Sequence, residues 1–351
     1  MLKLGIIGCG RIVEFAHADA LKRLSDEVEV VALSDPSEVR LEAVGGMLQI
    51  GTDHRYADYR EMLKREDMDF VDIAVPPFLH EKVLLDCAEA KVHVILEKPI
   101  ASTLEEVDRM LEAVEANGIT LSVLHNYRYS PGAAEALELV KQGRIGAPFL
   151  FRSEVLSAGY WPGADGYDPA WRTKRNQAGG GCLLDNGYHN IYLAREIMQS
   201  PVVSVYARIG TFAHEMDVDD TAVLVLTHAG GGITNIQVSW AVKSGVAGFH
   251  EVYGKKGALS FTPGIFAKKP IDPIDKENNR VAVFDHATEA WEYPEVDYGY
   301  ENSFAELMHD CFEKHVRGEA IFTDGAEARK NLAVIIAAYE SARTGKVVEV
   351  G

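Results

Sequence analysis

A carboxylate and an imidazole that lie four residues apart, Asp185 and His189, are the side chains of this sequence best suited to proton transfer. On a helix this spacing places both side chains on one face. A carboxylate beside an imidazole can set the tautomer and basicity of the ring. Glycines at 179–181 precede the pair and Gly187 separates its members, which we interpret as close approach of a ligand to the backbone. The alternative is an exposed helix pair that contributes roughly a few tenths of a kcal/mol.

A further candidate is Lys98, in the sequence Glu97-Lys98-Pro99 directly after a predicted strand at 92–96. The carboxyl ends of parallel strands are where open α/β sheets bind ligands. A lysine there can donate hydrogen bonds to a substrate hydroxyl and stabilise a developing alkoxide. The commoner role of a lysine in such a turn is simple solvation, so the tripeptide alone does not decide between the two.

A glycine-rich turn near the N-terminus predicts a dinucleotide site. Gly8 and Gly10 lie between a predicted strand and a predicted helix, where backbone can approach a pyrophosphate at the helix N-terminus. Asp35 follows the second predicted strand, and a carboxylate there binds ribose hydroxyls and repels a 2′-phosphate. We therefore expect NAD, although Arg11 or Arg40 could reach the extra phosphate of NADP. The predicted contacts of this turn are Gly8, Gly10, Arg11, Ile12 and Asp35.

The first third of the chain alternates strand and helix patterns, which predicts βαβ units and a parallel sheet. A capping box from Thr103 to Glu106 opens one of these helices and Gly118 closes it. The predicted strands span 3–8, 29–34, 70–75, 92–96 and 120–124, and the predicted helices 11–24, 37–48, 79–91 and 103–117.

Beyond residue 124 strands follow one another without intervening helices, which predicts an antiparallel sheet. A hairpin turn is expected at 254–257. The Asp185 helix has an apolar stripe through Leu184, Tyr188 and Ile191, with Asp185, His189 and Tyr192 on the neighbouring stripe. Predicted strands span 149–156, 202–209, 221–227 and 233–242, a long loop spans 157–178, and further helices span 131–143, 301–317 and 326–344.

These patterns predict an α/β chain with two domains. The first, residues 1–125, is expected to be a Rossmann dinucleotide-binding domain. The second, residues 126–351, is expected to be an α+β domain with a largely antiparallel open sheet, for substrate binding and oligomerisation. The closing helices could pack back on the first domain. A length of 351 residues accommodates two cores of this kind.

The composition sets limits on partners and compartment. Asp and Glu number 53 against 35 Lys and Arg, a formal charge of −18 that argues against nucleic acid or an anionic membrane as partner. Apolar runs fall short of the roughly 20 residues that span a bilayer. The N-terminus shows no signal-peptide pattern. The four cysteines are widely scattered without zinc-like spacing, so we expect a reduced, cytoplasmic protein.

Taken in order, the motifs resemble those of the Gfo/Idh/MocA family of sugar and polyol oxidoreductases, over essentially the full length. The motifs are the glycine-rich turn, Pro76-Pro77-x-x-x-His80, Glu97-Lys98-Pro99, the glycine-rich Asp185-x-x-x-His189 helix, and the ending Ser341-Ala342-Arg343-Thr344-Gly345. Val13 departs from the glycine or alanine usual at the third position of the turn, which affects helix–sheet packing there.

The resemblance implies roles for several of these residues. Lys98 would lie near both nicotinamide and substrate, and Asp185 and His189 would face the substrate. The Lys98–Pro99 peptide bond would be cis. Pro76 and His80, and with them Glu97 beside Lys98, would line the nicotinamide side. His80 could equally be a helix-start residue with no ligand role.

The implied activity is NAD(P)-dependent hydride transfer between nicotinamide and a secondary hydroxyl or ketone of a sugar, inositol or sugar derivative. His189 would act as base in oxidation and acid in reduction, since its unperturbed pKa is about 6.5. Asp185 would orient the substrate or His189, and Lys98 would hold the reacting oxygen. Lys98 could instead carry the proton if burial depressed its pKa.

Substrate contacts are expected from segments near the ends of the first domain's strands and from the long loop. Aromatic faces with Arg and Asn donors suit a sugar ring, and the arginines suit a substrate carboxylate or phosphate. A cluster of His214, Asp217, Asp219 and Asp220 indicates a polar loop, and we expect no metal. The predicted substrate contacts are Asn126, Arg128, Trp171 and Arg172.

Two other classes fit the same motifs. One is a redox-neutral, NAD-using glycoside-processing enzyme, and the other is a non-catalytic NAD-binding regulator, since a fold does not fix a function. The expected partners are a small sugar or polyol and a second copy of the chain. A homodimer or homotetramer through one face of the second sheet is expected.

Overall fold

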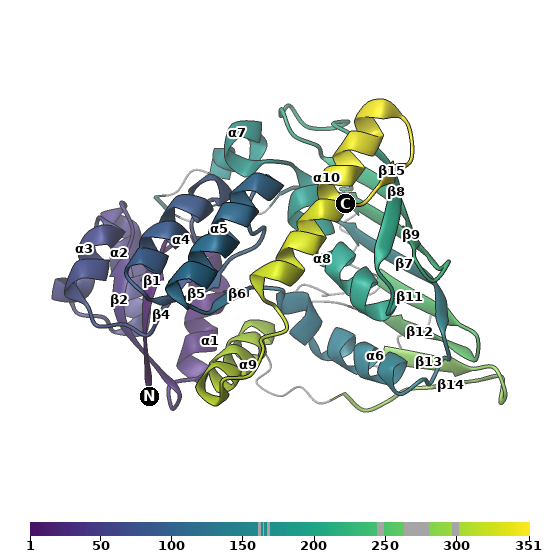
Figure 1. Ribbon diagram of the computed structural model, residues 1–351, viewed down its shortest axis with the longest axis horizontal. Helices are drawn as coiled ribbons and strands as arrows, with labels where there is room; N and C mark the ends of the chain where they lie inside the picture. Colours follow the sequence, from purple (N-terminus) through teal and green to yellow (C-terminus); the bar gives the residue numbers. More distant parts are fainter. Residues whose placement is uncertain (161–162, 164, 167–168, 244–248, 263–280, 297–301) are drawn as a thin grey trace. The chain divides into compact units, whose positions relative to one another are not determined.

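In the computed structural model the chain folds into two units, shown in Figure 1. The structure describes residues 1–160, 163, 165–166, 169–243, 249–262, 281–296 and 302–351. The first unit combines Met1–Leu124, Phe304–Leu332 and the described residues of Trp161–Gly179. The second combines His125–Tyr160, Ala333–Gly351 and the described residues of Gly180–Ser303.

The first unit is built on a parallel sheet. Short apolar segments form its strands, and residues such as Leu4, Phe70 and Val94 are fully buried because helices cover both faces of such a sheet. The strands are β1 (Leu2–Ile7), β2 (Val28–Ser34), β3 (Arg55–Tyr56), β4 (Phe70–Ile73), β5 (His93–Leu96) and β6 (Leu121–Val123). Their order is β3-β2-β1-β4-β5-β6, with every pair parallel. This Rossmann order reverses between β1 and β4, the point at which such sheets bind ligands.

The helices of the first unit begin and end close to the predicted residues. The capping box from Thr103 to Glu106 and the left-handed Gly118 are both present. The predicted helix at 11–24 differs, because a π-helical turn, η1 (Val13–His17), precedes α1 (Ala18–Arg23). The others are α2 (Glu38–Leu48), α3 (Tyr59–Arg65), α4 (His80–Glu89), α5 (Leu104–Asn117), α7 (Arg175–Ala178) and α9 (Ser303–Arg317), with short 3₁₀ turns η2 (Thr52–His54), η3 (Pro77–Leu79) and η5 (Pro169–Thr173).

Sequence patterns missed two elements of this unit, β3 and α3. A two-residue edge strand and a seven-residue helix are too short to show a period. The predicted long loop at 157–178 likewise contains η5 and α7, whose five and four residues carry no periodic pattern. Figure 1 shows α4 and α5 side by side against the sheet.

The second unit is built on a nine-stranded mixed sheet in the described part of the chain. Its order is β14-β13-β12-β11-β7-β10-β9-β8-β15. The strands are β7 (Pro148–Leu156), β8 (Val202–Gly210), β9 (Thr221–His228), β10 (Ile233–Ser239), β11 (Phe249–Gly254), β12 (Gly257–Phe261), β13 (Val281–Asp285), β14 (Ala290–Glu292) and β15 (Val348–Glu349). The predicted hairpin at 254–257 is confirmed by the antiparallel pairing of β11 with β12.

One pairing departs from the antiparallel prediction. Strands β7 and β10 are parallel, with Ile233 opposite Leu150. They are parallel because the chain leaves the sheet after β7 and returns through a helical crossover before it enters β8. The prediction assumed that consecutive strands pair antiparallel, so it missed this parallel pair. The sheet remains mostly antiparallel as predicted.

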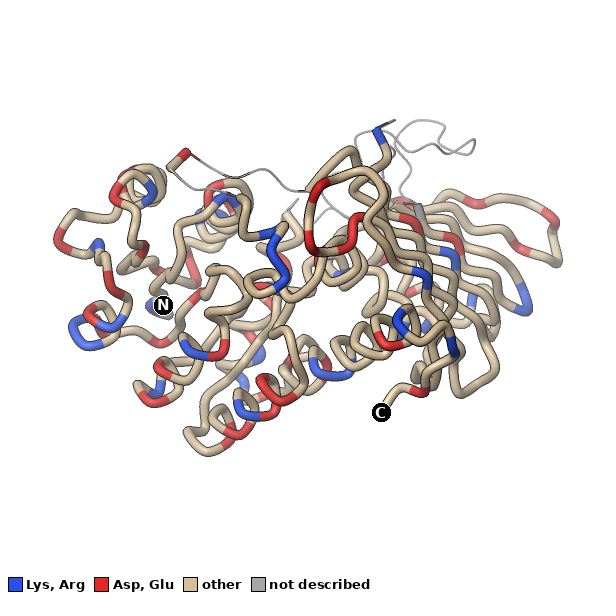
Figure 2. The backbone as a smooth tube through the Cα atoms, turned by 90° about the horizontal axis from the view of Figure 1, so that it is seen from above, with Lys and Arg blue, Asp and Glu red and all other residues tan. Residues whose placement is uncertain are grey.

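Helices cover one face of this sheet. The helix α8 (Cys182–Ile197) packs on β7, β9 and β10, and α6 (Pro131–Lys141) packs beside it, preceded by the 3₁₀ turn η4 (Asn126–Tyr129). The last helix, α10 (Gly325–Thr344), contributes its second half to this unit. In Figure 1 none of the described helices of this unit lies against the other face, on which Val223 and Val225 are each 39% exposed. Figure 2 shows basic residues interspersed with acidic ones along both units.

Helix α8 was predicted to present His189 and Tyr192 away from the core, and this is wrong. His189 is 6% exposed and Tyr192 is 2% exposed. The helix lies between the sheet and neighbouring segments, so its second stripe is covered as well. Its amphipathic pattern is therefore weaker than that of a surface helix.

The N-terminus of α8 is held by Asp219, which lies in the loop before β9. Asp219 Oδ1 accepts hydrogen bonds from Gly181 N at 2.9 Å and from the Tyr339 hydroxyl at 2.7 Å. Asp219 Oδ2 accepts from Leu183 N at 2.8 Å, and its backbone oxygen accepts from Cys182 N at 2.9 Å. A carboxylate at this end also complements the helix dipole. The cap thus comes from 38 residues away rather than from the adjacent sequence.

The glycines around α8 are explained by this packing. A Cβ on Gly181 would overlap the backbone oxygen of Asp219, and one on Gly180 would overlap the Tyr339 hydroxyl. A Cβ on Gly187 would lie 2.7 Å from Leu183 Cδ1. Our interpretation that these glycines make room for a ligand is therefore wrong at Gly180 and Gly181, and it stays a prediction at Gly187, where the contact is the end of a flexible side chain.

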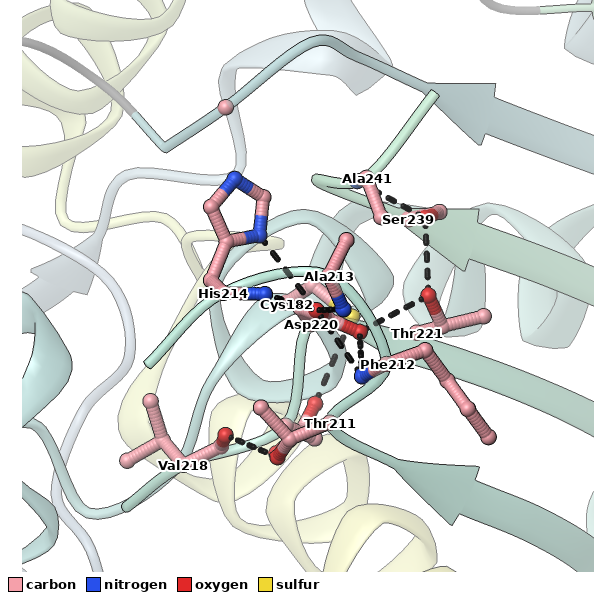
Figure 3. Close-up of polar contacts among 12 residues, drawn as sticks. Cys182, Thr211, Phe212, Ala213, His214, Val218, Asp220, Thr221, Ser239 and Ala241 are labelled. Atoms are coloured by element: carbon pink, nitrogen blue, oxygen red, sulfur yellow. Dashed lines mark hydrogen bonds and ion pairs between the residues drawn. The ribbon is translucent and has the colours of Figure 1, made fainter. Parts of the chain in front are cut away.

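The neighbouring Asp220 fixes the loop that carries Asp219 (Figure 3). Its buried carboxylate accepts backbone hydrogen bonds from Phe212 at 3.0 Å, Ala213 at 2.7 Å and His214 at 3.1 Å. These amides favour the ionised form and hold the pKa of Asp220 below its usual value, against the opposing effect of burial. Asp219 and Asp220 of the predicted polar loop therefore have structural partners.

Replacing Gly181 by alanine is expected to destabilise the protein by about 1–3 kcal/mol, because backbone rather than a flexible side chain must move to admit the methyl group. Gly46→Ala is the control, since no atom within 4 Å would meet its Cβ inside α2, and it should stabilise by about 0.5–1 kcal/mol. Urea-unfolding midpoints would measure both. Equal midpoints for the two variants would contradict the close packing of Asp219 on Gly181.

Candidate functional site

The glycine-rich turn after β1 has the geometry of a phosphate cradle. Gly8 adopts φ +95°, and a Cβ there would lie 2.6 Å from the Ala74 oxygen, so glycine is required by the protein itself. Gly10 differs, because a Cβ there would meet no described protein atom within 4 Å. Open space beside a glycine at a helix start is what a bound pyrophosphate needs. Arg11 and Ile12 follow directly as the first helical residues.

Asp35 lies at the end of β2 and is tied to this turn. Its Oδ2 accepts a hydrogen bond from Cys9 N at 2.8 Å, and its Oδ1 accepts one from Ser37 N at 2.8 Å. Burial raises the pKa of Asp35, and the two amides act in the opposite direction. The carboxylate is thus fixed beside the glycine turn, where the predicted ribose contact requires it.

The two arginines that could favour NADP differ in their surroundings. Arg40 is 1% exposed and donates to Cys9 O at 2.7 Å and to Glu14 Oε2 at 3.0 Å, so internal contacts hold its guanidinium. Arg11 is 37% exposed along its side chain and lies 3.7 Å from Glu14. The position of Arg40 favours the prediction of NAD over NADP.

The turn that carries Lys98 is braced from both sides. The Lys98–Pro99 peptide bond is cis, as the resemblance implied. Glu97 Oε2 accepts a hydrogen bond from Lys98 N at 2.9 Å. His80 is fully buried at the start of α4, and its ring nitrogens lie 2.9 Å from the oxygens of Pro99 and Val75. The ring of His80 therefore joins the Lys98 turn to the turn that begins at Pro76.

A buried histidine that we did not single out from the sequence, His17, supports the same turn. His17 Nδ1 donates to Asp72 Oδ2 at 2.8 Å, and Nε2 donates to Glu97 Oε1 at 3.1 Å. Because carboxylates only accept, both nitrogens carry protons and the ring is an imidazolium. Burial disfavours that charge, but the two carboxylates outweigh it and raise the pKa of His17 to about 10. The sequence signal was the polar His17 in the middle of an otherwise apolar helix stripe, between Val13 and Leu24.

In the second unit Asp185 lies in the first turn of α8 and is half-buried. His189 follows one turn later, and its Nδ1 lies 2.8 Å from the Tyr192 hydroxyl. Tyr127 stacks on the His189 ring with centroids 3.9 Å apart. Tyr127 and Tyr192 thus fix the ring plane, a role that the sequence had assigned to Asp185 as one option.

The four predicted substrate contacts lie in different settings. Arg128 donates to Glu196 Oε2 at 2.9 Å, so a carboxylate partners the guanidinium within the second unit. Asn126 is 3% exposed and donates to Ser303 Oγ at 3.4 Å. Trp171 and Arg172 belong to the first unit, where the guanidinium lies 4.4 Å from the indole centroid. The structure thus divides these four residues between the two units.

The described residues also bear on metal binding, membrane insertion and cysteine reactivity. No group of three or more His, Cys, Asp or Glu side chains there is arranged to hold a metal ion. No helix among them is long and apolar enough to cross a membrane. Cys9 and Cys182 are fully buried, and burial raises the pKa of each thiol, which suppresses the nucleophilic thiolate.

Comparison with known proteins adds family matches that span most of the chain. Residues 2–125 match the model described as oxidoreductase family, NAD-binding Rossmann fold. Residues 133–260 match the Gfo/Idh/MocA C-terminal domain.

Individual relatives agree with these matches. The chain is 32% identical to the uncharacterized oxidoreductase YrbE of Bacillus subtilis, over 73% of this chain and 72% of the relative. It is also 32% identical to myo-inositol 2-dehydrogenase of Thermotoga maritima, over 74% of each. Among solved structures, the WlbA dehydrogenase of Bordetella pertussis in complex with NADH and UDP-GlcNAcA is 25% identical, with a TM-score of 0.81 over 100% of this chain and 99% of that one.

The charge on His17 predicts a pH-dependent stability. Its folded pKa of about 10 exceeds the unfolded value of about 6.5, so its contribution is complete below about pH 6.5 and is lost as the pH rises to about 10. Within this window the unfolding free energy should fall by up to about 1.4 kcal/mol per pH unit. Denaturant unfolding across the window would measure this slope.

His17→Gln should lack this contribution to the slope, while the exposed His54→Gln should keep it. His17→Gln should also be less stable at neutral pH, because Asp72 and Glu97 lose their shared donor in a buried site. A slope in His17→Gln equal to that of the wild type would show that the ring is not charged in the folded protein.

Proposed function

Because the chain belongs to the Gfo/Idh/MocA family of NAD-binding oxidoreductases, we propose that it transfers a hydride between nicotinamide and a secondary hydroxyl or ketone of a sugar, inositol or sugar derivative. The observation that carries the proposal is the pair Asp185 and His189 on one helix. Asp219 caps the N-terminus of this helix, and Tyr127 and Tyr192 contact the ring of His189. The relative named myo-inositol 2-dehydrogenase supports this substrate class.

The proposed reaction divides its tasks between the two units. When bound, NAD supplies the hydride acceptor in oxidation and the hydride donor, as NADH, in reduction. Gly8, Gly10 and Asp35 bind its pyrophosphate and ribose, in a turn with open space beside Gly10. Lys98 holds the reacting oxygen of the substrate and stabilises its charge. Asp185 and His189 bind the substrate hydroxyls, and either His189 or Lys98 carries the proton.

NAD rather than NADP is the proposed cofactor. Asp35 is a fixed carboxylate beside the glycine turn, and a 2′-phosphate next to it would be repelled. Arg40, which could have compensated, donates to Cys9 and Glu14 instead.

We further propose a homo-oligomer that forms through the helix-free face of the second sheet. Tyr206, Val223 and Val225 are 37%, 39% and 39% exposed there on adjacent strands. Exposed apolar residues clustered on a sheet face mark an interface. A reducing compartment such as the cytoplasm suits the four cysteines, all of which are buried and unpaired.

A panel of sugars and inositols, assayed for NAD or NADP reduction, tests the activity. We expect NADH formation with at least one member and weaker activity with NADP. Lys98→Ala should lower kcat/KM on that substrate by roughly 10²–10⁴-fold, because the reacting oxygen loses its positioned donor. Lys82→Ala, an exposed lysine on α4, is the matched control and should leave kcat/KM unchanged. Tight NAD binding without turnover of any member would favour the regulatory alternative.

The assembly is tested by Val225→Lys, which places a charge among the exposed apolar residues of this sheet face. Light scattering after size-exclusion chromatography should show a dimer or tetramer for the wild type and a monomer for the variant. Glu42→Lys, at an exposed position on α2, controls for the added charge. A wild type that is monomeric at micromolar concentration would refute the proposed interface.

A further inference from the structure

The ring of His189 is held by two tyrosines of the second unit. Tyr127 lies flat against it, with an interplanar angle of 12°. Tyr192 approaches its edge, with an interplanar angle of 78°, and the phenol oxygen lies 2.8 Å from Nδ1. His189 is 6% exposed and Tyr192 is 2% exposed, so the Nδ1 contact is shielded from water. The chemical state of the ring therefore depends on what Tyr192 can offer to Nδ1.

The hydroxyl of Tyr192 has two partners among the described residues, and one of them settles the direction of the other bond. The backbone N–H of Tyr127 donates to the phenol oxygen at 2.9 Å, and an amide N–H cannot accept. The phenol proton therefore needs an acceptor elsewhere, and Nδ1 of His189 is the remaining partner. The arrangement satisfies every polar atom only if Tyr192 donates to Nδ1.

The opposite tautomer is less favourable. If Nδ1 carried the proton, the Tyr192 oxygen would receive two donors and its own proton would be buried without an acceptor. An unsatisfied buried donor costs about 1–3 kcal/mol, equivalent to a population ratio of roughly 5- to 150-fold. Burial also raises the pKa of Tyr192 well above its ordinary value, so the phenol keeps its proton.

We propose that Tyr192 is a positioning residue that holds neutral His189 with its proton on Nε2, so that His189 meets the substrate oxygen as a hydrogen-bond donor. This rests on the proposed function for its catalytic meaning, although the tautomer itself does not. The sequence alone did not predict which nitrogen of His189 carries the proton. A tyrosine three residues after the histidine supplies it.

The consequence for the reaction concerns which group accepts the proton. An Nε2 that already carries hydrogen cannot take the proton of the alcohol. Of the two proton carriers considered for this reaction, this leaves Lys98, which would act as its neutral amine and become an ammonium in oxidation. The electron pair of the carbon–hydrogen bond leaves with its hydrogen as hydride to nicotinamide, and the carbonyl forms. His189 keeps its proton throughout and stabilises the negative charge that develops on the oxygen.

The tautomer is measured directly by nitrogen NMR of the full chain labelled with ¹⁵N-histidine, without cofactor or substrate. The His189 signals are assigned by their loss in His189→Gln. We expect Nδ1 to show the shift of an unprotonated ring nitrogen and Nε2 that of a protonated one at neutral pH. A protonated Nδ1, alone or together with Nε2, would overturn the proposal.

Tyr192→Phe tests whether the phenol is the cause. The variant removes the donor to Nδ1, so part of the His189 population should move its proton to Nδ1. On the substrate found by the panel, kcat should fall by roughly 10- to 100-fold with little change in KM, because the donor is misplaced while binding contacts remain. An unchanged tautomer in Tyr192→Phe would refute the assignment to Tyr192.

Tyr188→Phe is the matched control, because it deletes another buried phenol oxygen from the same helix. The Tyr188 hydroxyl lies 3.4 Å from Nε2 of His125. This variant should leave the His189 signals unchanged and keep kcat within about 2-fold of the wild type. The same loss in both variants would indicate a packing effect and contradict the proposal.

The two readouts separate this inference from the proposed function. The Nε2-protonated tautomer together with an inactive panel would support the inference on the ring and refute the proposed activity. An active panel together with an Nδ1-protonated ring would support the activity and refute the inference.

Discussion

The carboxylate of Asp219 closes the N-terminus of α8, and the candidate chemistry of the second unit depends on that contact. It accepts the amides of Gly181 and Leu183 and the hydroxyl of Tyr339, so one buried side chain ties the helix start to α10 and to the loop before β9. Asp185 is only one turn from this cap. A shift of the helix start would therefore move Asp185, His189 and Tyr192 together, because helical geometry couples their positions.

In the first unit, a buried ion cluster supports the turn that carries Lys98. His17 lies between Asp72 and Glu97, and Glu97 in turn accepts the amide of Lys98. A charged ring in such a site is costly unless it is paired on both sides, which the two carboxylates accomplish. The π-helical turn that ends at His17 begins at Val13, where the glycine turn departs from the family pattern. The nucleotide-binding helix and the Lys98 turn are thus joined through one imidazolium.

The sequence predicted the Rossmann order of elements, the capping box at Thr103, the hairpin at 254–257 and the cis bond before Pro99, each of which the structure confirms. It failed for the parallel pairing of β7 with β10, for the burial of His189 and for the reason behind Gly181. The first group depends on nearest neighbours along the chain or on motifs. The second depends on which distant segments come into contact, and periodicity contains no information about that.

The sequence by itself determined the residue types available for chemistry: a carboxylate and an imidazole at helical spacing, a lysine at a strand end and a glycine turn before an acidic residue. Only the tertiary structure decided the state of these groups. Whether Nδ1 of His189 accepts or donates depends on Tyr192 and on the backbone amide of Tyr127, which lies 65 residues before Tyr192 in sequence. Protonation in a buried site is decided by every polar neighbour together, since each donor there must find an acceptor.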